Sequence, residues 1–241
     1  MSTLAIIPVK AESQRLSGKN FLEVGGTTLV RRAWDLARQG IEIGLFDAVA
    51  ISYDQWHARL VEIRDCQGAL PSTLHQQPGE RPPTTTLAVV QDLLAKSDTR
   101  KCDCSGSFHE VRWDLICLLV PTSPLRTLKH LVQSRLRLEG QDLVMSVAPF
   151  RESVAGAVAI EDGLVKLVAD DPHQHVDAWK HEGTVIWARA QWFGAGPKHW
   201  YDAGRIAAYP MDRMESVDID YEVDLVLARA LDARSVGREI A

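Results

Sequence analysis

Residues 4–20 read LAIIPVKAESQRLSGKN, and this stretch decides how the remaining chain is interpreted. It begins with an apolar run of the length typical of a buried strand. The loop that follows contains three cations, Lys10, Arg15 and Lys19, with small residues and a glycine suited to a turn. A strand that leads into such a loop is suited to bind a polyanion such as a phosphate chain, the alternative being an ordinary surface loop. The loop lacks the glycine patterns of P-loop and dinucleotide sites, so neither is indicated.

The composition is that of one folded globular domain. The chain has 241 residues, of which 46% are hydrophobic and 24% are charged, enough for one sizeable core. The formal net charge of −5 argues against nucleic acid as a partner. The sequence shows neither a signal peptide nor an apolar run of membrane-spanning length, so we expect a cytoplasmic protein with no membrane partner. Because the chain shows no secretory signal, the four cysteines are expected to be free thiols in a reducing cytoplasm. A zinc site at Cys102 and Cys104 is not expected, since the further ligands are lacking.

Helix-like and strand-like stretches alternate through the first two thirds of the chain. This rhythm predicts an α/β fold with a mostly parallel sheet flanked by helices. Residues 97–112 are polar and are expected to form an exposed loop. The periodicity predicts helices over 28–39, 84–96 and 127–139, a further helix from Asp54 toward Cys66, and strands over 46–52, 70–75, 114–120 and 142–148.

The regular alternation of helix-like and strand-like stretches ends near Pro149. Asp162 and Gly163 form a strong hairpin-turn signal between the apolar stretches 155–160 and 164–168. A strand over 184–188 is expected to return to the core, and an amphipathic helix is expected over 219–233. We therefore predict a single domain over residues 1–241, with a small β-rich arm inserted at about residues 149–182.

Two further stretches carry candidate ligands. Thr122 and Ser123 follow a buried strand, at the edge of the sheet where ligands bind in this fold class, although such residues also cap helices. Near the end, residues 215–225 read ESVDIDYEVDL. If 217–219 is extended, Asp218 and Asp220 project to the same side and could hold Mg²⁺. The alternative is that Asp220 caps the last helix.

Three blocks of this sequence, IIPVKAESQRLSGKN, LLVPTSPLRT and SVDIDYEVDL, occur in the order and spacing of a known family. Together they resemble the cytidylyltransferases that activate sialic acid and related nonulosonic acids, over nearly the whole chain. The resemblance implies a nucleotidyltransferase-like fold and transfer of CMP from CTP to the anomeric hydroxyl of a nonulosonic sugar acid, with release of pyrophosphate. It also implies that the arm contacts a second subunit in a homodimer.

The resemblance assigns roles residue by residue. Asp218 and Asp220 match the acidic pair that binds the metal, here Mg²⁺. Asp218, or a water on the metal, would take the proton of the attacking hydroxyl, while Lys10, Arg15 and Lys19 would stabilise the transferring phosphates. The residues expected to bind the nucleotide are Lys10, Ser13, Arg15, Lys19, Asn20, Arg81, Thr122 and Ser123.

The chain departs from the family pattern at several positions. Lys10 stands where the first loop usually has Arg, and Gln77 replaces an Arg after the third strand, with Arg81 as the nearby substitute. Val120 and Glu182 lie where the family handles its sugar. These departures leave two alternatives open: the same reaction on another sugar acid such as KDO, or a relative that binds nucleotide without catalysis. The histidines of the arm are interpreted as surface or interface residues; they are His173, His175 and His181.

Overall fold

The computed structural model describes residues 1–11, 13, 15–55, 60, 72–77, 85–95, 100–102, 108–110, 112–150, 158–161, 164–167 and 178–239. Several predictions fall on residues outside these ranges. They are the nucleotide role of Arg81, nearly all of the helix expected from Asp54 toward Cys66, and the roles of His173 and His175.

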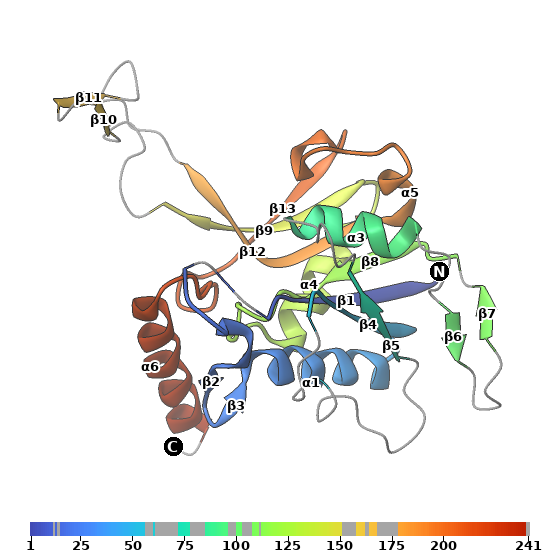
Figure 1. The fold of residues 1–241 in the computed structure, drawn as a ribbon, viewed down its shortest axis with the longest axis horizontal. Coiled ribbons are helices and arrows are strands. Elements are labelled where there is room, and N and C mark those ends of the chain that lie inside the picture. Colours follow the sequence, from blue (N-terminus) through green and yellow to red (C-terminus); the bar gives the residue numbers. More distant parts are fainter. Residues whose placement is uncertain are drawn as a thin grey trace.

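Seven described strands form the central sheet, in the order β13-β9-β12-β8-β1-β4-β5 (Figure 1). The pairs β1–β4, β1–β8, β4–β5 and β9–β13 are parallel, whereas β12 is antiparallel to both β8 and β9. The predicted α/β fold with a mostly parallel sheet is therefore confirmed. The strands span Thr3–Val9 (β1), Ala48–Tyr53 (β4), Ser72–Gln76 (β5), Leu115–Leu118 (β8), Leu143–Pro149 (β9), Trp179–Arg189 (β12) and Ile206–Pro210 (β13).

Helices cover both faces of this sheet, because the central strands are apolar on both sides. Every residue of β1 and β4 is buried. Ala5 and Ile7 of β1 pack in the cluster that includes α1 (Leu29–Glu42) and α4 (Leu128–Leu136). Leu4 and Ile6 pack on the other side, with α3 (Thr86–Ala95) and α5 (Ala190–Phe193). Because side chains alternate between the two faces of a strand, successive residues of β1 pack in two separate cores, one on each face of the sheet.

The last helix, α6 (Glu222–Glu239), packs beside the short β2–β3 pair (Glu23–Val24 and Thr27–Thr28), as Figure 1 shows. A third apolar cluster joins Val24, Ile219 and Leu225. Arg32 of α1 reinforces this contact, since its guanidinium pairs with Asp232 at 2.6 Å and donates to the Val24 carbonyl at 3.0 Å. The segment before α6 is thereby held against the loop that follows β1.

Local sequence signals determine where the helices begin. The Thr28 hydroxyl accepts a hydrogen bond from the Arg31 backbone N–H at 3.3 Å at the start of α1. Thr127 does the same for His130 of α4 at 3.4 Å, within a capping box. Each expected helix and strand that falls in the described ranges occurs, with boundaries that differ by a few residues.

Two expectations about the irregular stretches need correction. Within the stretch expected to be an exposed loop, the described residues form two strands, because β6 (Arg100–Cys102) pairs with β7 (Phe108–Glu110) in antiparallel fashion. The returning strand β12 starts at Trp179, within the segment assigned to the arm, because Trp179–His181 pair with the end of β9. The hairpin expected in the arm occurs as β10 (Val158–Glu161) and β11 (Leu164–Leu167), and Figure 1 shows this pair standing away from the main sheet.

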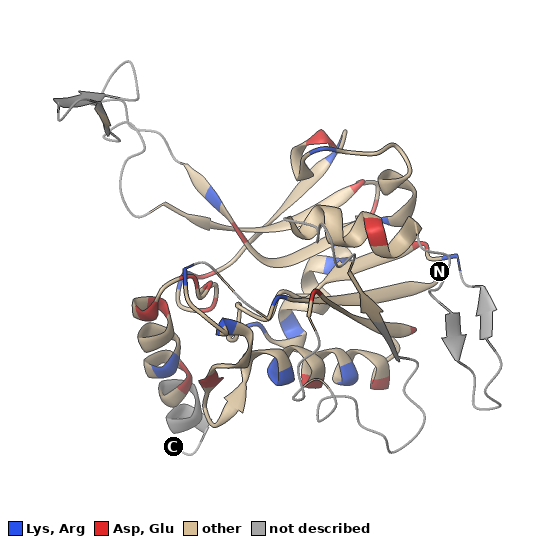
Figure 2. Cartoon of the chain, in the orientation of Figure 1, with Lys and Arg blue, Asp and Glu red and all other residues tan. Residues whose placement is uncertain are grey.

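Lys and Arg positions and Asp and Glu positions are interspersed along the helices and loops (Figure 2). On α1, ion pairs of helical spacing join Arg31 to Asp35 and Arg38 to Glu42, each at 3.0 Å. In the part of the chain that the structure describes, no helix combines the length and the apolar character that a membrane span requires.

Ser134 fixes the Trp187 indole inside the core. Its hydroxyl accepts from Trp187 Nε1 at 3.0 Å and donates to the His130 carbonyl at 2.6 Å, and both side chains are fully buried. We expect Ser134→Ala to lower the free energy of unfolding by about 1–3 kcal/mol, because the indole N–H loses its partner. Urea denaturation measures the change, with the exposed Ser17→Ala as the matched control. Equal stability of the two variants would contradict this role.

Candidate active site

The cationic loop after β1 is held in place by backbone and amide contacts. The Ala11 N–H donates to Asp54 Oδ1 at 2.8 Å, which ties the loop to the end of β4. The Asn20 side-chain amide is buried and donates to the Lys10 carbonyl at 2.8 Å. Gly18 has a φ of 59°, the left-handed conformation that glycine adopts without strain, and starts the short 3-10 helix Lys19–Phe21. Asn20 therefore shapes the loop in this structure, and Lys10 lies exposed at its start.

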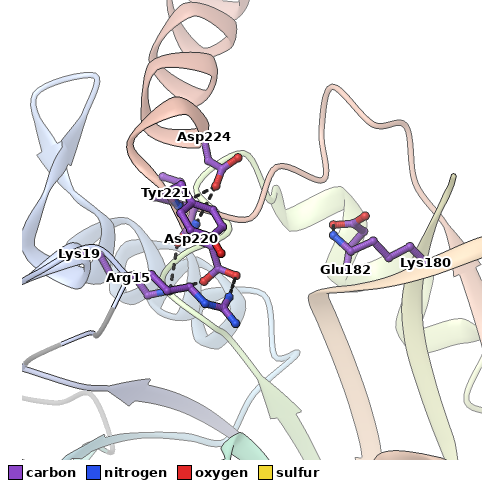
Figure 3. Close-up of polar contacts among 8 residues, drawn as sticks. Arg15, Lys19, Lys180, Glu182, Asp220, Tyr221 and Asp224 are labelled. Carbon is purple, nitrogen blue, oxygen red and sulfur yellow. Dashed lines mark hydrogen bonds and ion pairs between the residues drawn. The ribbon is translucent and has the colours of Figure 1, made fainter. Parts of the chain in front are cut away.

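Asp220 brings this loop together with the acidic segment near the C-terminus. Its carboxylate pairs with the Arg15 guanidinium and, at 2.8 Å, with the Lys19 ammonium (Figure 3). Lys19 also donates to the Ile219 carbonyl at 3.1 Å. Burial alone would raise the pKa of Asp220, but Lys19 and Arg15 together lower it. The cations and the acidic segment, predicted as separate parts of one site, are in direct contact.

Asp218 has a different environment from Asp220. Its Oδ1 atom is buried and has no hydrogen-bond partner among the described residues. Burial raises the pKa of Asp218, and the nearby charge of Asp220 adds to the shift, whereas a hydrogen bond from the Thr122 hydroxyl opposes it. The Ile219 N–H donates to the Thr122 carbonyl at 2.9 Å, which joins the loop after β8 to the acidic segment.

Thr122 and Ser123 are both buried, and neither caps α4, because Thr127 has that role. Thr122 instead contacts Asp218, as described above. Ser123 Oγ is buried without a hydrogen-bond partner in the described part of the chain. Ser13 of the first loop is partly buried. The described candidates thus gather around the first loop and the acidic segment, while Arg81 lies outside the described residues.

The contacts described for the Asp220 carboxylate are those with Arg15 and Lys19, whereas Asp224 binds the backbone just before α6. Asp224 Oδ2 accepts from the backbone N–H groups of Asp220 at 3.0 Å and Tyr221 at 2.8 Å. Glu222 and Asp224 lie in the first turn of α6, where negative charge complements the helix dipole. The carboxylate of Asp220 is left for the contacts with Arg15 and Lys19.

Two polar side chains near the site are buried and bind other parts of the chain. Arg126, which follows Thr122 and Ser123 after β8, donates to the carbonyls of Thr184 at 2.5 Å and Val120 at 3.2 Å. Burial lowers the pKa of Arg126 to about 10. Gln77, at a family departure, is also buried and donates to Ser52 Oγ at 3.2 Å. Both residues hold loop and strand ends together, and no pattern in the sequence distinguishes such buried polar groups from exposed ones.

A cavity of about 640 Å³ opens beside the acidic pair. Asp218 and Asp220 line one part of it, and Lys180, Glu182 and Arg213 line another. Figure 3 shows Lys180 and Glu182 across the open space from Asp220. Sequence reasoning missed Lys180 and Arg213, although Glu182 had been singled out as a departure from the family. The volume lies within the range usual for pockets that bind small molecules.

The acidic pair is suited to Mg²⁺ by its chemistry. The described residues contain no group of three or more His, Cys, Asp or Glu side chains arranged to hold a metal. Mg²⁺ needs only one or two carboxylates when waters and substrate phosphates complete its shell. The unpartnered Oδ1 of Asp218, close to a second carboxylate, fits this mode of binding.

The two carboxylates should affect stability with opposite signs. The pKa of Asp218 is raised, so the folded state loses free energy of unfolding as the pH rises above the usual carboxyl pKa of about 4. Asp218→Asn removes that penalty and should raise the Tm at about pH 7, with the gain fading in acid. The pKa of Asp220 is lowered, so its charge stabilises the folded state at neutral pH, and Asp220→Asn should lower the Tm there slightly. Calorimetry between about pH 4 and pH 7 measures the Tm of both variants. A Tm change of the same sign in the two variants at about pH 7 would contradict the opposite pKa shifts of the two carboxylates.

Comparisons with known proteins add to this geometry. No family model matches the sequence. The chain is 25% identical over 240 residues to a CMP-N,N'-diacetyllegionaminic acid synthase of Legionella pneumophila, with 96% of each chain covered. A CMP:2-keto-3-deoxy-manno-octonic acid synthetase complexed with CTP superposes with a TM-score of 0.65 at 14% identity, covering 98% of this chain and all of that one. A 4-diphosphocytidyl-2C-methyl-D-erythritol synthase from Anaerococcus prevotii gives a TM-score of 0.65 at 12% identity, with 95% of each chain covered.

The structural matches, at such low identity, establish the shared fold: a mostly parallel sheet flanked by helices. The sequence match extends over nearly the whole of both chains. The resemblance carried by the three sequence blocks is thereby confirmed, because the chain is similar over nearly its whole length to a protein named as a CMP-N,N'-diacetyllegionaminic acid synthase.

Proposed function

We propose that this protein is a cytidylyltransferase that transfers CMP from CTP to the anomeric hydroxyl of a nonulosonic sugar acid and releases pyrophosphate. The observation that carries the proposal is the meeting of Arg15 and Lys19 with Asp220, next to Asp218 and a cavity for an acceptor. The Legionella relative is named as a synthase of CMP-N,N'-diacetyllegionaminic acid, which is the product of the same reaction on a nonulosonic acid, and this supports the proposal.

The cations of the first loop have the charge that a triphosphate requires. In the proposal, Lys10, Arg15 and Lys19 bind the β- and γ-phosphates and stabilise the negative charge that develops on the departing pyrophosphate. Arg15 and Lys19 already lie beside the acidic pair, so a nucleotide bound there has its α-phosphate near Asp218 and Asp220. Asn20 contributes by shaping the loop, and the remaining residues proposed to contact the nucleotide are Ser13, Arg81, Thr122 and Ser123.

Asp218 and Asp220 are proposed to hold Mg²⁺, which when bound supplies positive charge to the α-phosphate and the leaving pyrophosphate. Asp218 is also the proposed acceptor of the proton that the attacking hydroxyl loses. Its Oδ1 has no described partner, and burial raises the pKa of the carboxyl, which favours proton uptake.

The proposal includes a homodimer and a cytoplasmic location. The β10–β11 pair supports the first, because an isolated two-stranded pair is only marginally stable in water and its Ile160 is 75% exposed. Phe150 and Trp179, at the base of the arm, are also exposed apolar side chains. Cys117, a buried free thiol, is compatible with a reducing compartment.

The reaction is tested by pyrophosphate release from each nucleoside triphosphate with a panel of sugar acids. We expect turnover with CTP, Mg²⁺ and a nonulosonic acid, and loss of turnover when a chelator removes the divalent cation. Turnover only with KDO would identify the alternative substrate, and nucleotide binding without any turnover would identify a non-catalytic relative. Equal turnover with all four nucleoside triphosphates would refute the proposed selectivity for CTP as the donor.

Substitutions at the charged residues separate donor binding from chemistry. Lys19→Met should raise the KM for CTP about tenfold or more, since one charge-assisted phosphate contact is lost. Asp218→Asn and Asp220→Asn should each lower kcat by about 100-fold or more. Steady-state kinetics with circular dichroism as a folding check measures these effects. Asp35→Asn, which removes a carboxylate from an ion pair on α1, is the control, and a normal kcat in Asp220→Asn would refute its assignment.

A further inference from the structure

His130 lies where α4 meets both segments that form the acidic site. Its side chain is buried in the first turn of the helix, and its Nδ1 accepts a hydrogen bond from the Thr127 backbone N–H at 3.2 Å. Because Nδ1 serves as an acceptor, the neutral ring carries its proton on Nε2. Nε2 faces Glu215 Oε2 at 3.5 Å, so this proton is directed toward the carboxylate.

The contact with Glu215 extends the packing of α4 against β13. The Tyr209 hydroxyl of β13 donates to Gln133 Oε1 of α4 at 3.0 Å. The His130 ring lies against the Tyr209 ring, with 6.4 Å between the two centroids. The helix is thus joined to the strand through Tyr209 and, beyond the end of the strand at Pro210, to Glu215.

Glu215 belongs to a hydrogen-bonded turn just before the acidic pair. Its backbone N–H donates to the Asp212 carbonyl at 3.0 Å, and Asp212 Oδ1 accepts from the Met214 N–H at 2.7 Å. The two residues that follow Glu215 are buried, and the next one is Asp218. The position of this turn therefore sets the position of the Asp218 carboxylate.

The other partner of His130, Thr127, ends the loop that carries Thr122. Arg126 of this loop donates to the Thr184 carbonyl, in a bulge where β12 shifts its register against β9. The loop is thus fixed to the sheet by Arg126 and to α4 by the capping box of Thr127 and His130.

We infer that His130 is a positioning residue of the reaction, which binds Thr127 through Nδ1 and Glu215 through Nε2 and so holds Asp218 against Thr122 in the arrangement that the divalent cation requires. The two segments meet where the Ile219 N–H donates to the Thr122 carbonyl at 2.9 Å. The inference rests on the proposed function and adds to it a residue that acts through its neighbours.

The charge state of His130 agrees with this role. Burial lowers the pKa of His130, Glu215 opposes this shift, and the cations Lys129 and Arg126 add to it. The ring is therefore neutral at about pH 7, and Nδ1 remains an acceptor. Because Glu215 is 54% exposed, its contact with the ring contributes little to the free energy of unfolding. An effect of its loss on metal use would therefore report on position and not on stability.

The test compares His130→Asn, Glu215→Ala and the double variant with the wild type. Asn retains an acceptor for the Thr127 N–H near the position of Nδ1 and lacks the donor toward Glu215. At saturating CTP, with the best sugar acid of the panel described above, each single variant should raise the Mg²⁺ concentration for half-maximal turnover about tenfold. The double variant should match the single ones, because both changes remove the same contact. Glu42→Ala removes a carboxylate of equal exposure, 55%, from an ion pair on α1; it is the control and should match the wild type.

A second measurement does not depend on turnover. The Tm increase that Mg²⁺ with CTP gives over CTP alone should be smaller in His130→Asn and Glu215→Ala than in the wild type, and unchanged in Glu42→Ala. Since Glu215 is exposed, its variant tests the inference independently of how well His130→Asn folds.

The outcomes separate this inference from the function on which it rests. A wild type that shows neither turnover of CTP nor a Tm gain from Mg²⁺ would refute the proposed function and the inference with it. Normal wild-type turnover, with an unchanged Mg²⁺ dependence in Glu215→Ala, would refute the role of His130 while the function stands. A lower Tm without ligands, together with an unchanged gain from Mg²⁺, would reduce His130 to a structural contact and overturn the inference. Additive losses in the double variant would overturn it as well.

Discussion

The contact of Asp220 with two cations is the interaction on which the site depends. Lys19 and Asp220 are 201 positions apart, yet their charged groups lie within 2.8 Å. Without a ligand, three cations of one loop would repel one another, and two neighbouring carboxylates would do the same. Pairing across the two segments relieves both repulsions at once, so the folded chain can keep the groups gathered before any substrate arrives. When substrate binds, its phosphates can replace the Asp220 carboxylate as partners of Arg15 and Lys19, which are already in position.

That contact is possible because hydrogen bonds from other polar groups fix the loop after β1 and the acidic segment before α6. The Thr122 carbonyl receives the Ile219 N–H, and Asp224 receives the N–H groups at the start of α6. Asn20 and Asp54 do the same for the first loop. These bonds are made by backbone groups, by the Asn20 amide and by carboxylates other than Asp218 and Asp220. The reactive carboxylates are therefore not needed for local folding, and Asp218 is even left with an unpartnered oxygen that lowers stability.

Local patterns in the sequence were sufficient to predict the elements of the fold. The apolar run of β1, the helical periodicity of α1 and α4 and the alternation of strands with helices are properties of neighbouring residues, and they are found in the structure. The meeting of Arg15 with Asp220 could be anticipated because both follow from the general rule for ligands in such sheets and from the family resemblance. The burial of Arg126 could not be anticipated, since an arginine after a strand looks the same whether it faces a ligand or carbonyls from a distant strand. The extent of β12 and its bulge likewise depend on pairing with β9, which no local pattern encodes.

The antiparallel pairing of β9 with β12 has a consequence for how this protein can change. Ala148 and Pro149 lie directly opposite Lys180 and Trp179, so the chain leaves the sheet and re-enters it at adjacent points. An excursion whose two stems already touch can be lengthened, shortened or exchanged at little entropic cost and without disturbing the register of the sheet. Another module could therefore be inserted between β9 and β12, or an assembly interface redesigned there, without altering the residues of the candidate active site.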